Sequence, residues 1–200
     1  MVALPKPRPR PPWEDGHFVG GHVVLDLTNT VFDRAHPVAD NELLKTPSAA
    51  LAWCASVGLL EDGLPEVSGA AADALVSQLR AVREDAWAVF DAVARTAPIP
   101  EAPFGALLER GGAGLRDERL RGVDASRVPL DFDGEPDAIP AALSLSAVQA
   151  LFTLPRGRIR ACARCGWLFL DSSRGGRRRW CSMGTCGNRE KASRHRRGKR

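Results

Sequence analysis

The sequence predicts a mainly α-helical (α+β) protein, in which a helical N-terminal domain with a small β-hairpin is followed by a C-terminal treble-clef-like module. Three observations predict this architecture. Apolar residues recur at steps of three and four along much of the first 155 residues, which is the spacing of one helix face. Two extended segments, near residues 115–123 and 128–132, interrupt that pattern. Four of the five cysteines lie together in the last part of the chain.

Residues 1–12 are rich in proline and contain Lys6, Arg8 and Arg10. This composition predicts a disordered basic tail with polyproline character. The segment has no apolar stretch of the kind that a secretory signal needs, and no run in the chain approaches the roughly 18 to 20 apolar residues of a membrane span. We therefore expect a cytoplasmic protein.

The predicted helical domain, residues 13–155, starts with an apolar segment at 22–31 that fits either a buried strand or a helix. A clear helix is predicted from Thr46, a good N-cap, and Pro47, which suits the first helical position. It should run to about residue 57, where Gly58 ends it.

A second, longer helix is predicted after Ser68, and the prolines beyond residue 97 end it. Its apolar positions follow helical spacing; they are Leu75, Leu79, Val82, Ala86, Val89, Phe90 and Val93. A short helix at 104–110 is expected to stop at Gly111-Gly112.

The extended segments 115–123 and 128–132 are expected to pair as a hairpin, because the residues between them, 124–126, have turn chemistry. Residues 136–154 predict a last helix of this domain. A Pro-Arg-Gly sequence at 155–157 breaks it and marks the predicted boundary with the C-terminal module, residues 156–200.

Charge is divided unevenly between these two parts. Residues 156–200 contain fifteen Lys and Arg against two acidic residues, a balance of +13, whereas the remaining chain has a balance of −9. This asymmetry indicates a basic module on an acidic body. A solvated basic tail is the plainer alternative, but the same segment also contains the clustered cysteines.

The cysteine spacing is typical of a structural zinc site. Cys162 and Cys165 are separated by two residues, fifteen residues lie between Cys165 and Cys181, and Cys181 and Cys186 are separated by four. In a chain without a secretory signal, such clusters indicate metal ligands rather than disulfides. Four thiolates complete the tetrahedron that Zn²⁺ prefers and leave no open position for catalysis. The fifth cysteine, Cys54, lies in an apolar stretch and reads as a small buried hydrophobe.

Between the two cysteine pairs, residues 167–170 and 178–180 are strand-like and 172–176 are turn-like, which predicts a hairpin there. Residues 182–195 predict a helix with Cys186 near its first turns. A knuckle, a hairpin and a helix that carries the last ligand form a treble-clef-like zinc finger.

At this point the chain resembles a known bacterial family. The C-terminal module is similar to the CGNR zinc finger, and the resemblance is carried by the segments 162–167 (CARCGW), 168–174 (LFLDSSR), 178–183 (RRWCSM) and 186–189 (CGNR). The body resembles the ABATE domain that precedes this finger, through 18–21 (FVGG), 25–30 (LDLTNT) and the apolar helix ahead of the finger. The glycines at 175 and 176 depart from the polar residue expected in that turn.

Members of this family are described as stress-induced transcription regulators. The resemblance implies a mainly helical N-terminal domain and DNA binding by the finger. It covers about residues 17–197, and its most specific part is the finger.

Basic residues of the finger are candidate phosphate contacts, because each neutralised phosphate releases counterions. The candidates are Arg177, Arg178, Arg179, Arg189, Lys191 and Arg194. Basic positions beyond residue 188 go all round a helix, which predicts a basic helix whose end frays into an arm. Asn188 fits either base readout or a structural role inside the finger.

Asp26 and Asn29 are the candidate lining of a ligand pocket in the body, with His17 and His22 nearby in sequence. The alternative is that these polar groups cap or satisfy the backbone. A small-molecule effector is expected from the role of a regulator and not from any residue. The body has no nucleotide-binding loop and no catalytic spacing, so we expect no enzyme activity.

Three classes of function remain. The first is a DNA-binding transcription regulator with a helical body. The second is an RNA- or ribosome-associated protein whose finger grips RNA by charge and shape. A protein-interaction module is a third reading.

Overall fold

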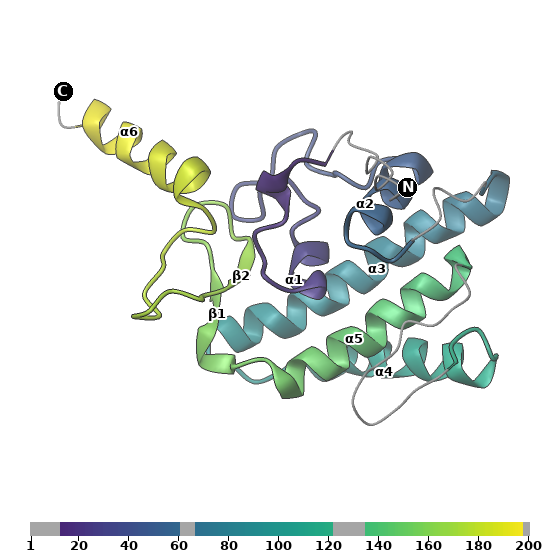
Figure 1. The fold of residues 1–200 in the computed structure, drawn as a ribbon. Coiled ribbons are helices and arrows are strands. Elements are labelled where there is room, and N and C mark those ends of the chain that lie inside the picture. The colour runs from purple at the N-terminus through teal and green to yellow at the C-terminus, as the bar shows by residue number, and fades with distance from the viewer. Residues whose placement is uncertain (1–12, 61–66, 122–134, 198–200) are drawn as a thin grey trace, which may run out of the picture.

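The computed structural model describes residues 13–60, 67–121 and 135–197, except for the side chain of Arg194 (Figure 1). The predicted tail at 1–12 therefore lies outside the described residues. The chain forms a helical body followed by a small two-stranded sheet and a final helix. The helices of the body are α1 (Val23–Thr28), α2 (Pro47–Ser56), α3 (Gly69–Ala94), α4 (Glu101–Arg116) and α5 (Ile139–Thr153). The mainly α fold class is confirmed.

Short 3₁₀ turns flank these helices, at Asp15–His17, Pro136–Ala138 and Arg156–Arg158. The sheet consists of β1 (Ile159–Ala161) and β2 (Leu168–Leu170). A π-helical turn at Met183–Gly187 leads into α6 (Asn188–Arg197). Among the described residues, no helix combines the length and the apolar character that a membrane crossing requires.

Local signals place the start of α2 as expected. The Thr46 side chain accepts a hydrogen bond from the Ala49 amide at 3.2 Å, and Pro47 occupies the first turn of α2. The segment 22–31, which fitted strand or helix, contains α1, and His22 caps it through Nδ1. Residues 24–28 are all buried, so the segment has no alternation of apolar and polar residues that could distinguish a helix from a strand.

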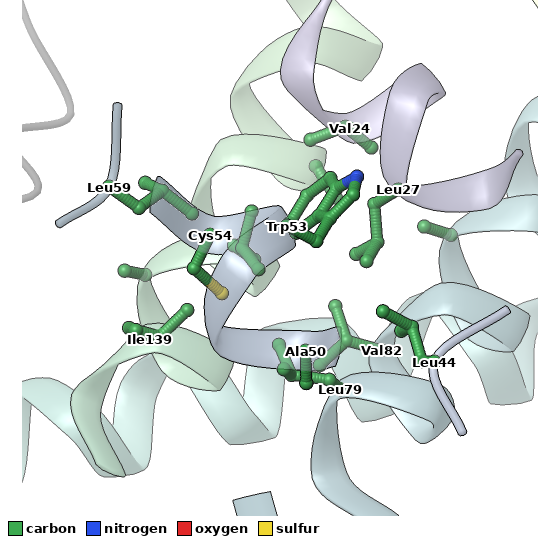
Figure 2. Packing of buried hydrophobic residues seen from close by; sticks show 14 of the residues in the cluster. Val24, Leu27, Leu44, Ala50, Trp53, Cys54, Leu59, Leu79, Val82 and Ile139 are labelled. Atoms are coloured by element: carbon green, nitrogen blue, oxygen red, sulfur yellow. The ribbon is translucent and has the colours of Figure 1, made fainter. Parts of the chain in front are cut away.

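The helices enclose one apolar core, with α3 at its centre (Figures 1 and 2). Trp53 and Cys54 of α2 lie deep inside this core, between α1, α3 and α5. The prediction that Cys54 is a small buried hydrophobe is confirmed. Its side chain has no exposure, and burial raises the pKa of the thiol to about 12.

The expected end of α4 at Gly111-Gly112 is wrong, because the helix continues to Arg116. Two glycines of this segment serve packing against α5 instead. A Cβ atom on Gly111 would lie 2.6 Å from Leu145 Cδ2, and one on Gly114 would lie 2.5 Å from Ala141 Cβ. Glycine here allows the two helix backbones to approach closely.

The longer α4 also removes the start of the expected strand at 115–123, since Leu115 and Arg116 are helical and a turn follows at 117–120. Its expected hairpin partner, 128–132, lies outside the described residues. A hairpin in the body is therefore not part of the fold as described.

The sheet differs from the expected hairpin in its second strand. β2 lies within the predicted strand 167–170, but its antiparallel partner is β1, with Ile159 opposite Leu170. Residues 178–180 form no strand. The turn between the strands is therefore the Cys162–Cys165 knuckle itself, and β1 lies within the predicted module, 156–200, ahead of its first cysteine.

The sheet is continuous with the body. Ile159 and Leu168 are buried in the same apolar core as the helices, and β2 packs against α1 and α3. The Leu170 amide also donates to the Gly20 carbonyl at 2.8 Å. Part of the sheet therefore belongs to the core of the preceding domain, while Trp167, Phe169 and the four clustered cysteines form a second buried cluster in the finger.

Candidate metal centre and nucleic-acid interface

The four cysteines of the finger come from two segments: the turn between β1 and β2, and the stretch that leads into α6. Cys162 follows β1 and Cys165 precedes β2, while Cys181 and Cys186 lie before and within the turn that leads into α6. All four are buried, and their Sγ atoms lie within 4.8 Å of one another. The geometry therefore forms one compact site of four sulfur atoms.

This site fits a zinc ion and not a disulfide. A tetrahedron of thiolates with Zn–S distances of about 2.3 Å has S···S edges of about 3.8 Å. The Sγ atoms of Cys165 and Cys181 are 3.7 Å apart. A disulfide would require about 2.05 Å, and all five cysteines are free thiols.

The electrostatics of the four thiols also favour a bound cation. Without a metal, the neighbouring Cys162 raises the pKa of Cys165, and burial raises the pKa of Cys186. Several thiolates at this separation repel one another in a buried site. A divalent cation at the centre removes that repulsion and deprotonates the thiols.

The knuckle is supported by a loop of the body. The amides of Arg34 and Ala35 both donate to the Cys165 carbonyl, at 2.8 and 3.2 Å. Gly166 has a φ of +73°, and a Cβ atom there would lie 2.9 Å from the Cβ of Arg34. Only glycine fits both the conformation and the close approach.

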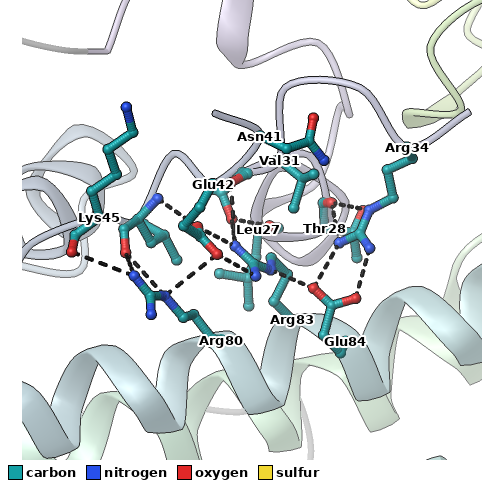
Figure 3. Close-up of polar contacts among 12 residues, drawn as sticks. Leu27, Thr28, Val31, Arg34, Asn41, Glu42, Lys45, Arg80, Arg83 and Glu84 are labelled. Atoms are coloured by element: carbon teal, nitrogen blue, oxygen red, sulfur yellow. Dashed lines mark hydrogen bonds and ion pairs between the residues drawn. The ribbon is translucent and has the colours of Figure 1, made fainter. Parts of the chain in front are cut away.

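Arg34 is in turn fixed to the body (Figure 3). Its guanidinium donates to the Thr28 carbonyl and to Glu84 on α3, and it stacks 4.8 Å from the ring centroid of Trp87. Next to it, Arg83 bonds Glu42 at 2.6 and 2.7 Å and Glu84 at 2.7 Å. The loop that supports the knuckle is therefore clamped to α3 by two arginines.

Asn29, one of the two candidate pocket residues, contacts the finger directly. Its Nδ2 donates to the Leu168 carbonyl at 2.8 Å, and its Oδ1 accepts from the Leu168 amide at 2.9 Å. Nearby, the Trp167 indole donates to the Val31 carbonyl at 2.6 Å. The whole Asn29 amide is thus engaged by the backbone of β2.

Asp26, the other candidate, accepts a hydrogen bond from the Gly20 amide at 2.7 Å. Burial raises the pKa of Asp26 to about 6, and the hydrogen bond from Gly20 offsets only part of this. Of the neighbouring histidines, His22 caps α1 and His17 accepts from the Glu14 amide. The polar atoms of this region mostly satisfy the backbone that joins the body to β2.

Asp171 organises the loop between β2 and Cys181, a role that sequence reasoning missed. It is buried, and its two oxygens accept from the amides of Ser173 and Arg178, at 2.9 and 2.8 Å. Hydrogen bonds, first from the Ser173 side chain and then from these amides, lower the pKa of Asp171 to about 2. The Asp-Ser-Ser sequence is a turn signal that could have pointed to it.

The adjacent arginines Arg178 and Arg179 have different surroundings. The Arg178 guanidinium donates to the Cys181 carbonyl and stacks 4.7 Å from the Phe169 ring centroid. It therefore fixes the segment around Cys181 against β2. The Arg179 side chain is exposed and lies over Trp180, 5.3 Å from the ring centroid.

The other candidates lie on the outside of the finger. Arg177, Arg189 and Lys191 are exposed, whereas the Arg194 side chain lies outside the described part of the structure. In Figure 1, α6 extends away from the helical body, and it is helical through Arg197 instead of fraying in its last described turns. We call the exposed Arg177, Arg179, Arg189 and Lys191 the basic surface.

Comparisons with known proteins match two family models to this chain. The model described as "Putative stress-induced transcription regulator" (ABATE) matches residues 21–157. The CGNR zinc finger model matches residues 158–199. Searches of the curated proteins and of the solved structures found no match.

Proposed function

This chain belongs to the ABATE family and carries a CGNR zinc finger, and on that premise we propose that it acts as a zinc-dependent, DNA-binding transcription regulator. The finger is the DNA-binding part. The observation that carries this proposal is the exposure of the basic surface on a finger that zinc and the body hold in place.

Zinc has a structural task in this proposal. Cys162, Cys165, Cys181 and Cys186 would hold it, and a four-thiolate zinc ion supplies a rigid cross-link rather than an open coordination position. We therefore propose a binding function and no catalytic one. Arg178 belongs to this structural part, because it bonds the carbonyl of a ligand cysteine.

The charge distribution favours a polyanionic partner. The +13 balance of residues 156–200 contrasts with −9 in the rest of the chain, so the body should repel nucleic acid while the finger attracts it. Only part of this positive charge is free to act. Arg158 and Arg160 bond backbone carbonyls of the loop around residues 171–176, and Arg164 lies 3.6 Å from Glu190.

Binding of the zinc-loaded full chain to duplex DNA, measured at several salt concentrations, tests the proposal. If the basic surface contacts about four to six phosphates, log affinity should fall against log salt with a slope of roughly −4 to −5. The double variant Arg189→Ala/Lys191→Ala should reduce that slope by about 2 and leave zinc content unchanged. Arg95→Ala, an exposed arginine on the body, is the matched control.

An RNA duplex and a single-stranded RNA of equal length complete the comparison. Tighter binding to either RNA would replace the DNA reading with an RNA-associated function. An affinity that is insensitive to salt, or that the double variant leaves unchanged, would remove the basic surface as a nucleic-acid site and favour a protein partner.

A further inference from the structure

The outer face of α4 exposes large apolar side chains. Leu108 and Leu115 are 46% and 38% exposed, and Phe152 of α5, which is 66% exposed, packs edge to face with Phe104 beside them. In Figure 1, α4 lies at the edge of the body opposite α6. The face is therefore accessible and distant from the basic surface.

Glycine alternates with leucine along this face. Gly105, Leu108, Gly112 and Leu115 follow one another at steps of three, four and three, which is the spacing of a helix–helix seam. Leu107, Gly111 and Gly114 are buried on a different face of α4, and the two glycines of that face pack against α5.

The two glycines of the seam have no packing role within the chain. A Cβ atom on Gly105 would meet nothing within 4 Å, and one on Gly112 would meet only the end of the Arg116 side chain, at 3.3 Å. Both glycines are half-buried, and glycine inside a helix is less favourable than alanine. Close approach by a second helix would explain why small residues lie here.

We propose that α4 is the contact face of a two-fold symmetric dimer of this chain, in which the two α4 helices pack antiparallel. Residues placed symmetrically about Arg110 then face each other. Leu108 meets Gly112 of the second copy, and Leu115 meets its Gly105, so each large side chain enters the space above a glycine. Arg110 does not obstruct the seam, because it points into the body and bonds Asp85 at 3.1 Å.

The charges beside the seam are also self-complementary. The guanidinium of Arg116 lies one turn back along its helix, beside Gly112. In the antiparallel pair, Gly112 lies opposite Leu108 of the second copy, and Glu109, which is exposed, is the next residue after Leu108. Arg116 of each copy thus faces Glu109 of the other, and the opposed helix dipoles add to the attraction. This match of charge and shape selects a second copy over an unrelated helix.

The contact is modest in size. A 16-residue helix is about 24 Å long, so the pair buries less than the about 800 Å² per partner of a standard interface. We therefore expect a dimer with a micromolar dissociation constant. This dimer is independent of nucleic-acid binding.

Sedimentation equilibrium of the zinc-loaded full chain, from about 1 to 300 μM, measures the dimer directly. Gly105→Gln fills the space that receives Leu115, yet it improves helix propensity, so its monomer should fold at least as well as the parent. We expect it, and Leu108→Glu, to weaken dimerisation at least about tenfold. Val38→Glu, at an equally exposed apolar residue outside α4, should change nothing.

Charge exchange tests the two-fold pairing itself. Glu109→Arg and Arg116→Glu should each weaken the dimer, and the double variant should restore it. A chain that stays monomeric throughout the range overturns the proposal. So does a dimer that Gly105→Gln and Leu108→Glu leave intact, or a charge exchange that fails to restore association.

Discussion

Asn29 joins two parts of the chain that are 139 residues apart in sequence. Its amide satisfies both the N–H and the C=O of Leu168, in a region with almost no solvent exposure. A polar group that loses its partner in such a place keeps its full desolvation cost of about 1–3 kcal/mol. The contact between body and finger at this residue should therefore contribute strongly to stability.

Replacement of Asn29 by Ala is expected to lower the free energy of unfolding by about 2–4 kcal/mol, because it orphans two buried backbone groups. Urea denaturation of the zinc-loaded protein measures this. Asn188→Ala, on the exposed start of α6, is the control and should stay within about 0.5 kcal/mol of the parent. A small effect at Asn29 would mean that water replaces its hydrogen bonds.

Asp26 gives a prediction for pH. Burial raises its pKa to about 6 in the folded protein, above the ordinary value of 3.8. Between these values the folded state binds more protons than the unfolded state, so this residue makes stability fall as pH rises, and its effect levels off above about pH 7. Depressed carboxyl groups such as Glu42 have the opposite sign.

Asp26→Asn removes this titration and keeps an oxygen for the Gly20 amide. The stability of the variant relative to the parent should therefore increase by about 1 kcal/mol between pH 5 and 8. Denaturation of both proteins at matched zinc concentration measures the difference, in which metal loss with acid largely cancels. A constant difference, or one that falls with pH, would contradict the raised pKa.

At the scale of elements, the loop that follows α1 is held to α3 by a network of charges (Figure 3). Arg83 is nearly buried and shares its charge between Glu42 and Glu84, while Arg80 bonds the Leu44 carbonyl. The same loop supplies the amides that bond the Cys165 carbonyl. The network therefore fixes the position of the zinc knuckle relative to α3.

Glu42→Ala should destabilise the protein by about 2 kcal/mol, because it leaves the Arg83 charge buried with one partner instead of two. Asp40→Ala removes an exposed ion pair with Lys45 in the same loop and should cost less than about 0.5 kcal/mol. Thermal and urea unfolding measure both. Equal effects of the two variants would show that burial of Arg83 adds nothing to the network.

The helices with capping signals and a clear apolar period could be predicted from the sequence. Thr46-Pro47 starts α2, and the stripe from Leu75 to Phe90 lies buried on α3 as expected. The zinc ligands were also recognisable, since their spacing is local. These features depend only on residues that are close in sequence, so they can be predicted from local patterns.

Features that depend on distant neighbours could not be predicted. Gly111 has the local signature of a helix end, but its meaning depends on Leu145 of α5. The partner of β2 was misplaced because β1 precedes the cysteines, while residues 178–180 look like a strand but form none. Asn29 looked equally suited to a ligand pocket, because nothing in its own segment reveals Leu168.

At the scale of the whole molecule, the finger and the body form one structure. β1 and β2 contribute Ile159 and Leu168 to the core of the helices, and the knuckle rests on the loop at Arg34. A finger that folds around its own metal would unfold by itself when a ligand cysteine is lost. The shared core leads us to expect otherwise.

Removal of zinc should lower the stability of the entire protein. We expect chelation, or Cys186→Ser, to shift one cooperative unfolding transition by several degrees or more, because loss of the metal loosens β2 and with it the core. Tryptophan fluorescence, which includes buried Trp53 of α2, and circular dichroism should shift together. A body signal that stays unchanged while the finger unfolds would show that the two are independent.

The central claim is that zinc fixes a basic finger that binds DNA. Titration of zinc into the metal-free full chain, with a labelled DNA duplex present, tests it most directly. We predict that fluorescence anisotropy rises in proportion to added zinc and saturates at one ion per chain, and that Cys186→Ser shows no such rise. Equal DNA affinity of the metal-free and zinc-loaded proteins would contradict the claim.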